Sequence, residues 1–506
     1  MTGGVAGRKV GAMTEDAPLL QLPAGTVRGM RRNGVRHFLS IPYAAPPVGE
    51  RRFAPPAPPQ PWTGERDGTR AGPNAPQRIG KVPGLSVEPL IGTGWSPGDD
   101  YLTLNIWAPD TSATALPVMV FIHGGGFLVG SKDAPVQDGA TFARDGVICV
   151  AINYRLGIDG FLPIEGVPTN LGLRDMIAAL QWVQDNVEAV GGDPGNVTVF
   201  GESAGAMAIA DLMTSPLAQG LFRRAVVQSG HGAMTRDIGI AKRVTAKLAR
   251  LLRVTPDAKG FGSVDPQAAF DAIEKLSKPA ARLDLRAPDG REPVFGISRF
   301  IPVHGDDVLP VPPPEALKAG AGADVDLLIG SNAEEMNLYL VPTGVRAKVN
   351  RLLAWFVLRK SHPRAWATLK AYGLGKAHAG TVLNNTLNDL VFRWPVRRFA
   401  EEHRGRTHVY EFEWRSTAFN GELGAAHGME LPFVFDRLDL AVGPEGLCGP
   451  SAPQQLADRI HAIWVGFARD GSLPWPEFTR DNRQVYRLGA GQAAHEPPMP
   501  AAPFLP

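Results

Sequence analysis

A serine between two glycines is the residue of this chain best suited to covalent chemistry. Ser203 lies in the run Gly-Glu-Ser-Ala-Gly at 201–205, after the apolar run 196–200 and before small residues that continue toward Leu212. This order predicts a strand, a tight turn and a helix, with the serine hydroxyl exposed on the turn. A serine hydroxyl becomes a nucleophile when a neighbouring base removes its proton. The pattern therefore predicts nucleophilic catalysis, although a glycine-rich turn with a capping serine would have the same residues.

A second glycine-rich segment lies upstream of the serine. Residues 118–122 are apolar, short and partly β-branched, which favours a buried strand. They run directly into His-Gly-Gly-Gly-Phe at 123–127. Consecutive glycines after a core strand leave backbone N–H groups that can turn toward a ligand, and such donors stabilise the negative oxygen of a tetrahedral intermediate. A merely flexible loop is the alternative.

A nucleophilic serine needs a base, and the base usually needs an orienting acid. When the serine lies on such a turn, the chain order is serine, acid, histidine. Of the histidines after Ser203, His427 follows the predicted strand 408–412 in a loop where the end of the sheet is expected. The acid should also follow a strand, and the loop after residues 326–330 holds both Glu334 and Glu335. The residues alone leave these two carboxylates open.

The elements that must position these residues alternate along the chain. Apolar runs predict strands at 101–107, 118–122, 147–154, 196–200, 225–227, 326–330 and 408–412, and helical spacing predicts helices at 173–190, 238–287, 346–372, 380–404 and 452–469. Alternation of this kind predicts the α/β class, with a doubly wound, mostly parallel central sheet and helical insertions. We expect residues 1–20 to be a disordered leader and residues 21–506 to form a single domain.

Composition narrows the classes of partner. The net charge of +2 over 506 residues is too small to indicate nucleic acid, and no apolar run approaches the ~18 residues that span a bilayer. The first residues lack the apolar stretch of a secretory signal, so a cytoplasmic enzyme is expected. Two cysteines, Cys149 and Cys448, cannot form a disulfide framework, although one disulfide stays open. No cluster of histidine and cysteine suggests a metal, and no cofactor is expected. The oligomeric state stays undetermined.

From about residue 27 to residue 478 the chain resembles the type-B carboxylesterases and lipases, a family that includes the cholinesterases. The motifs that carry the resemblance lie at 38–44, 99–105, 123–127, 192–194, 201–205 and 228–230 and in the loops that hold Glu335 and His427. The resemblance implies the α/β-hydrolase fold, a small-molecule ester substrate and a catalytic triad of Ser203, Glu335 and His427. The family pattern G-x-N-x-x-E selects Glu335 over Glu334.

The resemblance also implies supporting residues. The oxyanion donors would be the backbone N–H groups of Gly125, Gly126 and Ala204. A buried polar network behind the triad would consist of Glu202, Ser229 and Glu430, although polar residues near a loop would look the same in sequence. Two structural ion pairs are implied, Arg52 with Asp99 and Arg155 with Asp175.

The chain departs from the family pattern at several positions. Tyr101 replaces a disulfide cysteine, which fits a reducing compartment. The acyl-pocket tryptophan of the cholinesterases is absent, and Met234 lies near its expected position. Gly296 and Ser298 stand where two bulky aromatic residues of that pocket would lie. These departures predict a roomier acyl side. The choline-binding tryptophan of the cholinesterases has no clear counterpart in the irregular segment 70–98, so a choline substrate is not inferred.

Together these observations predict a serine carboxylester hydrolase that cleaves short- to medium-chain esters through an acyl-enzyme on Ser203. A binding protein of the same superfamily is a rival, but such proteins have lost the serine, and this chain retains it. A peptidase or a true lipase on the same fold has the same order of residues and stays open.

Overall fold

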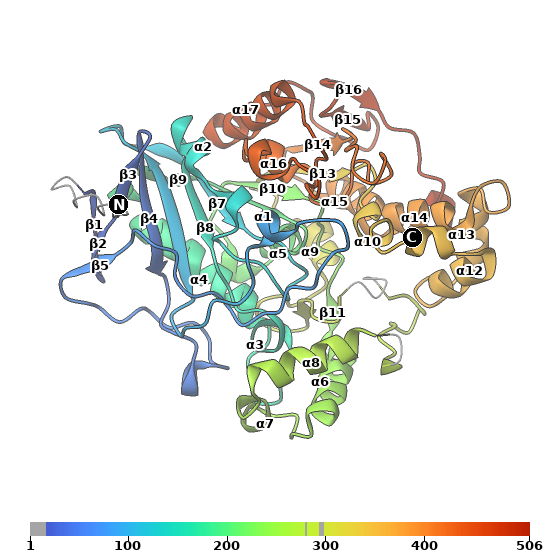
Figure 1. Ribbon diagram of the computed structural model, residues 1–506, viewed down its shortest axis with the longest axis horizontal. Helices are drawn as coiled ribbons and strands as arrows, with labels where there is room; N and C mark the ends of the chain where they lie inside the picture. Colours follow the sequence, from blue (N-terminus) through green and yellow to red (C-terminus); the bar gives the residue numbers. More distant parts are fainter. Residues whose placement is uncertain (1–16, 279–280, 293–297, 506) are drawn as a thin grey trace, which may run out of the picture.

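A central sheet runs through the molecule. The computed structural model describes residues 17–278, 281–292 and 298–505, and these residues form an 11-stranded sheet of order β16-β15-β14-β13-β10-β9-β7-β8-β6-β4-β3 (Figure 1). Its strands are β3 (Met30–Arg32), β4 (Val35–Pro42), β6 (Thr103–Pro109), β7 (Leu116–Ile122), β8 (Ile148–Ile152), β9 (Gly192–Glu202), β10 (Arg224–Gln228), β13 (Asp326–Asn332), β14 (Thr407–Phe412), β15 (Gln484–Arg487) and β16 (Gln492–His495).

The strands from β8 across to β15 are parallel, and the pairs at both edges are antiparallel. The predicted α/β class with a mostly parallel sheet is therefore confirmed. The sequence did not predict β15 and β16, which are short and carry polar residues. The strand predicted at 196–200 begins earlier in the structure, because β9 starts at Gly192.

The middle strands are buried on both faces, which explains their continuous apolar runs. In β7, Val118 and Val120 pack into one hydrophobic core, whereas Met119 and Phe121 pack into the other. Helices α4 (Leu171–Asn186) and α5 (Ala204–Leu212) contribute to the first core, and α16 (Leu431–Val434) and α17 (Gln454–Asp470) contribute to the second. The sheet thus lies between two helical layers.

Smaller elements complete the fold. Two further sheets contain β1 (Leu19–Leu22), β2 (Gly25–Arg28) and β5 (Glu65–Asp67), and β11 (Arg236–Asp237) and β12 (Val303–His304). Short helices are α1 (Glu88–Ile91), α2 (Ala140–Arg144), α3 (Gly157–Phe161), α9 (Pro313–Ala319), α10 (Asn337–Leu340) and single 3-10 turns at Gly49–Arg51, Pro135–Gln137, Val187–Val190, Pro216–Ala218, Leu438–Leu440 and Ala502–Phe504.

The predicted leader covered residues 1–20, of which 1–16 lie outside the described residues. Strand β1 begins at Leu19, so the last two residues of that range belong to a sheet. Among the helices of the described residues, none is both long and apolar enough to cross a membrane.

The long predicted helices are broken into pieces. The range 238–287 contains α6 (Ile238–Leu252), α7 (Ala258–Gly262) and α8 (Pro266–Ser277), and the range 346–372 contains α11 (Val345–Lys348), α12 (Arg351–Arg359) and α13 (Ala365–Ala371). The breaks have local causes. Arg253 ends α6 in the left-handed conformation, with φ 59°, and the side chains of Asp257, Asp265 and Asn350 cap the helices that follow them.

A π-helical turn interrupts the predicted helix at 380–404. Helix α14 (Ala379–Asn388) continues into the π-helical residues Asp389–Arg393 and then into α15 (Trp394–Glu402). Pro395 has no N–H group and cannot donate to the carbonyl four residues earlier. That carbonyl belongs to Val391 and lies 2.7 Å from Nε2 of His231 instead. The irregular turn therefore keeps its buried carbonyl group paired.

One of the two expected ion pairs is confirmed. Arg155 and Asp175 are fully buried and form a two-bonded pair, with Nη2 to Oδ1 at 2.7 Å and Nε to Oδ2 at 2.8 Å. The pairing of Arg52 with Asp99 is wrong, because Arg52 pairs with Asp159 at 3.0 Å. Arg52 does form an ion pair, as the resemblance implied, but its partner is different. Helix α3 brings Asp159 to the guanidinium, and Asp99 is exposed. Cys149 and Cys448 are both free and buried.

Candidate active site

Ser203 lies on a strained turn between β9 and α5. Its backbone has φ 56° and ψ −121°, a conformation that a non-glycine residue adopts only when its surroundings hold it there. The flanking glycines allow this close packing. A Cβ atom on Gly205 would lie 1.9 Å from the carbonyl oxygen of Ile122, and one on Gly201 would lie 2.6 Å from the same atom. The turn expected from the sequence is therefore present.

A continuous chain of short contacts runs from Ser203 to Glu335. Oγ of Ser203 lies 2.8 Å from Nε2 of His427, and Nδ1 of His427 lies 2.6 Å from Oε2 of Glu335. All three residues are buried. The second carboxylate oxygen of Glu335 accepts hydrogen bonds from Oγ of Ser229 at 2.6 Å and from the N–H of Asn332 at 2.7 Å. These donors fix the carboxylate against the imidazole.

Glu334, the neighbouring carboxylate, lies elsewhere. It accepts a hydrogen bond from the N–H of Ala425 at 3.0 Å and pairs with Arg415. The family register and the geometry therefore agree on Glu335 as the residue that contacts the imidazole.

The three residues expected behind the triad, Glu202, Ser229 and Glu430, each contact different partners. Oε1 of Glu202 lies 3.1 Å from Nε2 of His427. Ser229 donates to Glu335. The partners of Glu430 are different residues. Its carboxylate accepts hydrogen bonds from Nδ2 of Asn332 at 2.6 Å and from Nε2 of Gln228 at 3.2 Å.

Sequence reasoning missed part of this polar cluster. Asn332 bonds both Glu335 and Glu430, and Gln228 bonds Glu430 while it accepts a bond from Nε1 of Trp464 at 3.1 Å. Gln228 and Asn332 are the last residues of β10 and β13. Because the ends of parallel neighbouring strands lie at one edge of the sheet, their positions after apolar runs were the available signal.

The carboxylates around His427 set its protonation. Burial lowers the pKa of the imidazole, but the negative charges of Glu202 and Glu335 outweigh burial and raise it to about 9. Burial also raises the pKa of Glu202, to about 8, and that of Glu430, which the charge of Glu335 raises further. The pKa values of His427, Glu202 and Glu430 are therefore all higher than those of the isolated groups.

The glycine loop has the backbone that oxyanion donors need. Gly125 and Gly126 have φ 100° and 63°, and a Cβ atom on Gly125 would lie 2.1 Å from the carbonyl oxygen of Val129. Among the described residues, no acceptor takes a hydrogen bond from either of these two N–H groups. Ala204 is the first residue of α5, where an N–H group has no partner within the helix.

A cavity of about 1320 Å³ opens at Ser203 and His427. Gly125 and Gly126 line it, and so does a mainly apolar wall that includes Trp95, Met207, Met234, Phe270 and Ile301. Ser298 also lines the cavity, and its Oγ atom lies 3.2 Å from the carbonyl oxygen of Gly126. Gly296 lies outside the described residues, so its predicted place in the acyl pocket stays a prediction.

Aromatic rings cover the imidazole. The ring centroid of Phe392 lies 4.9 Å from that of His427, and the centroid of Tyr339 lies 5.6 Å from it. Phe392 belongs to the π-helical turn Asp389–Arg393, and both rings line the cavity. The conformation of this turn therefore shapes the surroundings of the imidazole.

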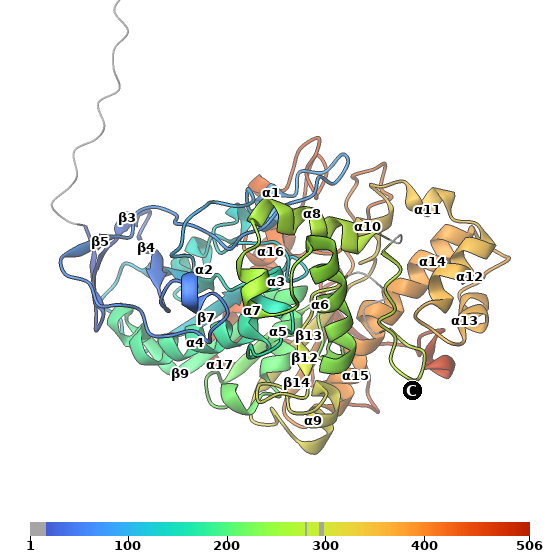
Figure 2. The same cartoon turned by 90° about the horizontal axis from the view of Figure 1, so that it is seen from below.

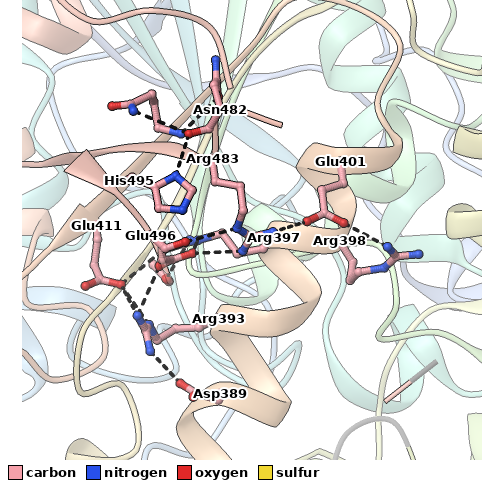
Figure 3. Close-up of polar contacts among 12 residues, drawn as sticks. Asp389, Arg393, Arg397, Arg398, Glu401, Glu411, Asn482, Arg483, His495 and Glu496 are labelled. Carbon is pink, nitrogen blue, oxygen red and sulfur yellow. Dashed lines mark hydrogen bonds and ion pairs between the residues drawn. The ribbon is translucent and has the colours of Figure 1, made fainter. Parts of the chain in front are cut away.

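A buried network of ion pairs holds that turn in place (Figure 3). Arg393 pairs with Asp389 and Glu411, both at 2.8 Å, and with Glu496 at 3.2 Å. Arg397 pairs with Glu496 at 2.8 Å and with Glu411 at 3.2 Å. The charges of Arg397 and Arg393 hold the pKa of Glu496 at about 2 against the effect of burial, which raises it. The network joins α15, β14 and the segment after β16.

Among the described residues, no group of three or more histidine, cysteine, aspartate and glutamate side chains is arranged to hold a metal ion. The expectation that the chemistry needs no cofactor stays a prediction.

Comparisons with known proteins identify the family of the chain. The chain matches the carboxylesterase family over residues 16–500. Para-nitrobenzyl esterase from Bacillus subtilis (strain 168) is 35% identical over 495 residues, which cover 92% of this chain and 93% of that protein. Phenmedipham hydrolase from Pseudarthrobacter oxydans is 34% identical, with 93% and 95% covered. Fumonisin B1 esterase from Sphingopyxis macrogoltabida is 33% identical, with 93% and 86% covered.

Solved structures give the same result. A structure of PNB esterase superposes with a TM-score of 0.82 at 31% identity and covers 97% of this chain and 100% of that one. The carboxylesterase EST55 of Geobacillus stearothermophilus at pH 6.2 superposes with a TM-score of 0.80 at 32% identity, with 95% and 98% covered. The sheet is that of the α/β-hydrolase fold, and the chain belongs to the carboxylesterase family and hydrolyses carboxylic esters.

Proposed function

We propose that the protein hydrolyses short- to medium-chain carboxylic esters through an acyl-enzyme on Ser203, with Glu335 and His427 as its partners. The observation that carries the proposal is the chain of contacts at 2.8 Å and 2.6 Å from Ser203 Oγ through the imidazole to Glu335. A nucleophile within hydrogen-bond reach of a base, itself oriented by an acid, is the arrangement that activates a serine.

The reaction has two halves. His427 takes the proton of Ser203 as Oγ attacks the ester carbonyl, and the N–H groups of Gly125, Gly126 and Ala204 stabilise the oxygen as its charge develops. The protonated imidazole then donates its proton to the leaving alcohol. In the second half a water molecule attacks the acyl-enzyme, His427 again takes the proton, and the acid is released as Ser203 regains its hydrogen. Glu335 stabilises the imidazolium in both halves.

The size and lining of the cavity support acyl chains longer than acetyl. A mainly apolar space of about 1320 Å³ beside Ser203 can bury several methylene groups, each worth about 0.8 kcal/mol. The small side chain of Ser298 on its wall leaves room next to the glycine loop. We therefore expect kcat/KM to rise from acetyl to butyryl or hexanoyl esters.

Replacement of the nucleophile tests the mechanism. Ser203→Ala should reduce turnover of p-nitrophenyl butyrate by on the order of 10⁴-fold or more while the melting temperature stays close to that of the native chain. A variant that keeps a tenth of the activity would overturn the proposal. A series from acetyl to long-chain esters, together with a triglyceride and a peptide amide, separates an esterase from a true lipase and from a peptidase.

The cysteines support a cytoplasmic location. Cys149 and Cys448 are free and buried, and Tyr101 replaces the family's disulfide cysteine. Cells separated from their secreted medium would test this, and most of the esterase activity should be found inside the cells rather than in the medium.

A further inference from the structure

One stretch of the chain has a charge unlike the rest. Residues 336–388 contain no aspartate or glutamate, although the whole chain carries a net charge of only +2. The same stretch contains eight basic residues: Arg346, Lys348, Arg351, Arg359, Lys360, Arg364, Lys370 and Lys376. Among the described residues, only Arg346 of these eight forms an ion pair, with Glu422 at 2.7 Å. The other seven have no carboxylate partner in the part of the chain that the structure describes.

Apolar side chains are exposed in the same stretch. Twelve large hydrophobic residues are exposed among the residues that the structure describes, and six of them lie between Val345 and Trp366. The most exposed is Leu352, at 73%. Leu352, Leu353, Phe356 and Val357 lie on the outer side of α12. Ala354 and Leu358 are buried on its inner side, where the helix contacts α13 and α14.

The two helices form an outer end of the molecule. Both views place α12 and α13 side by side at the edge of the fold, away from the central sheet (Figures 1 and 2). The apolar outer side of α12 is therefore turned away from the body of the protein. Exposed apolar groups gathered at one place mark a surface that another phase or molecule covers.

Basic groups lie directly against the aromatic rings of this surface. Nζ of Lys360 lies 4.4 Å from the ring centroid of Phe356, and Nζ of Lys370 lies 5.9 Å from that of Trp366. Cζ of Arg359 lies 4.5 Å from the ring centroid of Trp355. Apolar and cationic groups are thus mixed in one surface. Long basic side chains can keep their charge among lipid headgroups while the apolar residues beside them enter the acyl region.

We propose that the exposed face of α12 and α13 binds the surface of an anionic lipid bilayer. The apolar residues of α12 would enter the boundary between headgroups and acyl chains, and the basic residues would contact the negative headgroups. A second copy of this chain is a poor occupant, because two such faces would bring uncompensated positive charges together. A lipid surface supplies negative charge and an apolar layer at once.

Vesicle flotation with the full chain tests the proposal. The protein should float with vesicles of equal parts phosphatidylcholine and phosphatidylglycerol, and it should bind far less to phosphatidylcholine alone. Addition of about 0.5 M NaCl should weaken binding, because salt screens the headgroup charge. The double variant Leu352→Ser/Phe356→Ser should lower the partition coefficient on the order of tenfold or more. The charge variant Lys360→Gln/Lys370→Gln should lower it selectively for the anionic vesicles.

A matched control comes from exposed leucines elsewhere. Leu217→Ser/Leu251→Ser removes two leucines that are 45% and 38% exposed outside the basic stretch, and it should bind vesicles as the native chain does. Unchanged turnover of soluble p-nitrophenyl butyrate shows that each variant is folded. Equal binding to both kinds of vesicle, or variants that bind as well as the native chain, would overturn the proposal. Self-association in solution that Leu352→Ser/Phe356→Ser abolishes would instead assign the face to a second copy, and tight binding of polyglutamate that this variant leaves unchanged would assign it to an acidic macromolecule.

Discussion

Oε1 of Glu202 lies 3.1 Å from Nε2 of His427, the same ring nitrogen that faces Ser203. The imidazole is therefore in contact with a carboxylate at each of its nitrogens, since Glu335 lies at Nδ1. Both carboxylates favour the protonated ring, whereas a base must be neutral to take a proton from serine. This relationship makes the pH dependence of the reaction a direct test of the site.

Removal of one of these charges should move the pH profile. In Glu202→Gln the carboxylate that raises the pKa of His427 is gone, so the imidazole becomes neutral at lower pH. The acid limb of kcat/KM, which reports the free enzyme, should shift to lower pH than in the native chain, where the pKa of His427 is about 9. Titration of the released acid at constant pH measures the profile.

The matched control for that experiment is Glu430→Gln. The charge of Glu430 raises the pKa of His427 less than the charges of Glu202 and Glu335 do. The acid limb of kcat/KM should therefore shift less in Glu430→Gln than in Glu202→Gln. An acid limb that stays in place in Glu202→Gln would mean that Glu202 does not set the protonation of the base.

The adjacent carboxylates Glu334 and Glu335 allow a direct test of which one orients His427. Glu335→Gln should lower kcat on the order of 10⁴-fold, because an amide neither orients nor stabilises the imidazolium as a carboxylate does. Glu334→Gln removes only the charge that pairs with Arg415 and keeps an oxygen that can accept from the N–H of Ala425, so it should leave kcat close to the native value. Steady-state kinetics of both variants with one ester decide the matter, and a larger loss in Glu334→Gln would reverse the assignment.

The acyl pocket can be narrowed at one position. Ser298→Phe places a ring in the cavity beside the glycine loop and should lower kcat/KM for hexanoyl esters more than for acetyl esters. The ratio of kcat/KM for hexanoyl esters to kcat/KM for acetyl esters should fall by about fourfold for each methylene group that is no longer buried. This factor corresponds to about 0.8 kcal/mol. Ser298→Ala removes the contact with Gly126 without filling space and is the control. An unchanged ratio in Ser298→Phe would remove Ser298 from the acyl pocket.

A buried acid away from the active site should affect stability. Asp211 on α5 is 1% exposed, and neither of its carboxylate oxygens has a hydrogen-bond partner among the described residues. Burial raises its pKa well above 3.8. The folded chain then keeps a proton that the unfolded chain releases, so the free energy of unfolding falls as pH rises above the unfolded pKa, by at most about 1.4 kcal/mol per pH unit.

Asp211→Asn removes this proton release. Its melting temperature should exceed that of the native chain at pH 8, and the difference between the two proteins should shrink at pH 5. Asp193→Asn, which changes a half-buried carboxylate on β9, serves as the control and should show no such pH-dependent difference. A difference for Asp211→Asn that is equal at both pH values would show that its charge is not the cause.

The sequence was sufficient where chemistry restricts residue type. Ser203 and the glycine loop follow buried strands, and a tight turn with a close backbone approach accepts few other residues. The choice of Glu335 over Glu334 came from the family register, because two adjacent carboxylates on one loop look alike in sequence. The order of motifs along the chain and the family register thus identified the three residues that the structure brings into contact.

The rest depends on contacts between distant segments. Asn332 and Gln228 end ordinary apolar strands, and only the sheet shows that they meet Glu430. The partner of Arg52 was predicted wrongly, because no local pattern says that α3 approaches it. The π-helical turn was not predicted, because the group that pairs with its Val391 carbonyl is His231. That residue lies 160 positions earlier in the chain, and no local pattern links the two.

The ion-pair network of Arg393 and Arg397 (Figure 3) also bears on the synthesis of the chain on the ribosome. Arg397 is made 99 residues before Glu496, the carboxylate that contacts two of its nitrogens. During that interval the nascent chain carries two arginines destined for the interior, with Asp389 and Glu411 but without the last acid that neutralises them. Burial of incompletely paired guanidinium groups is unfavourable, so we expect α15 to pack against the sheet only after Glu496 has been added. We therefore expect the packing of Phe392 against His427 to follow the completion of this network.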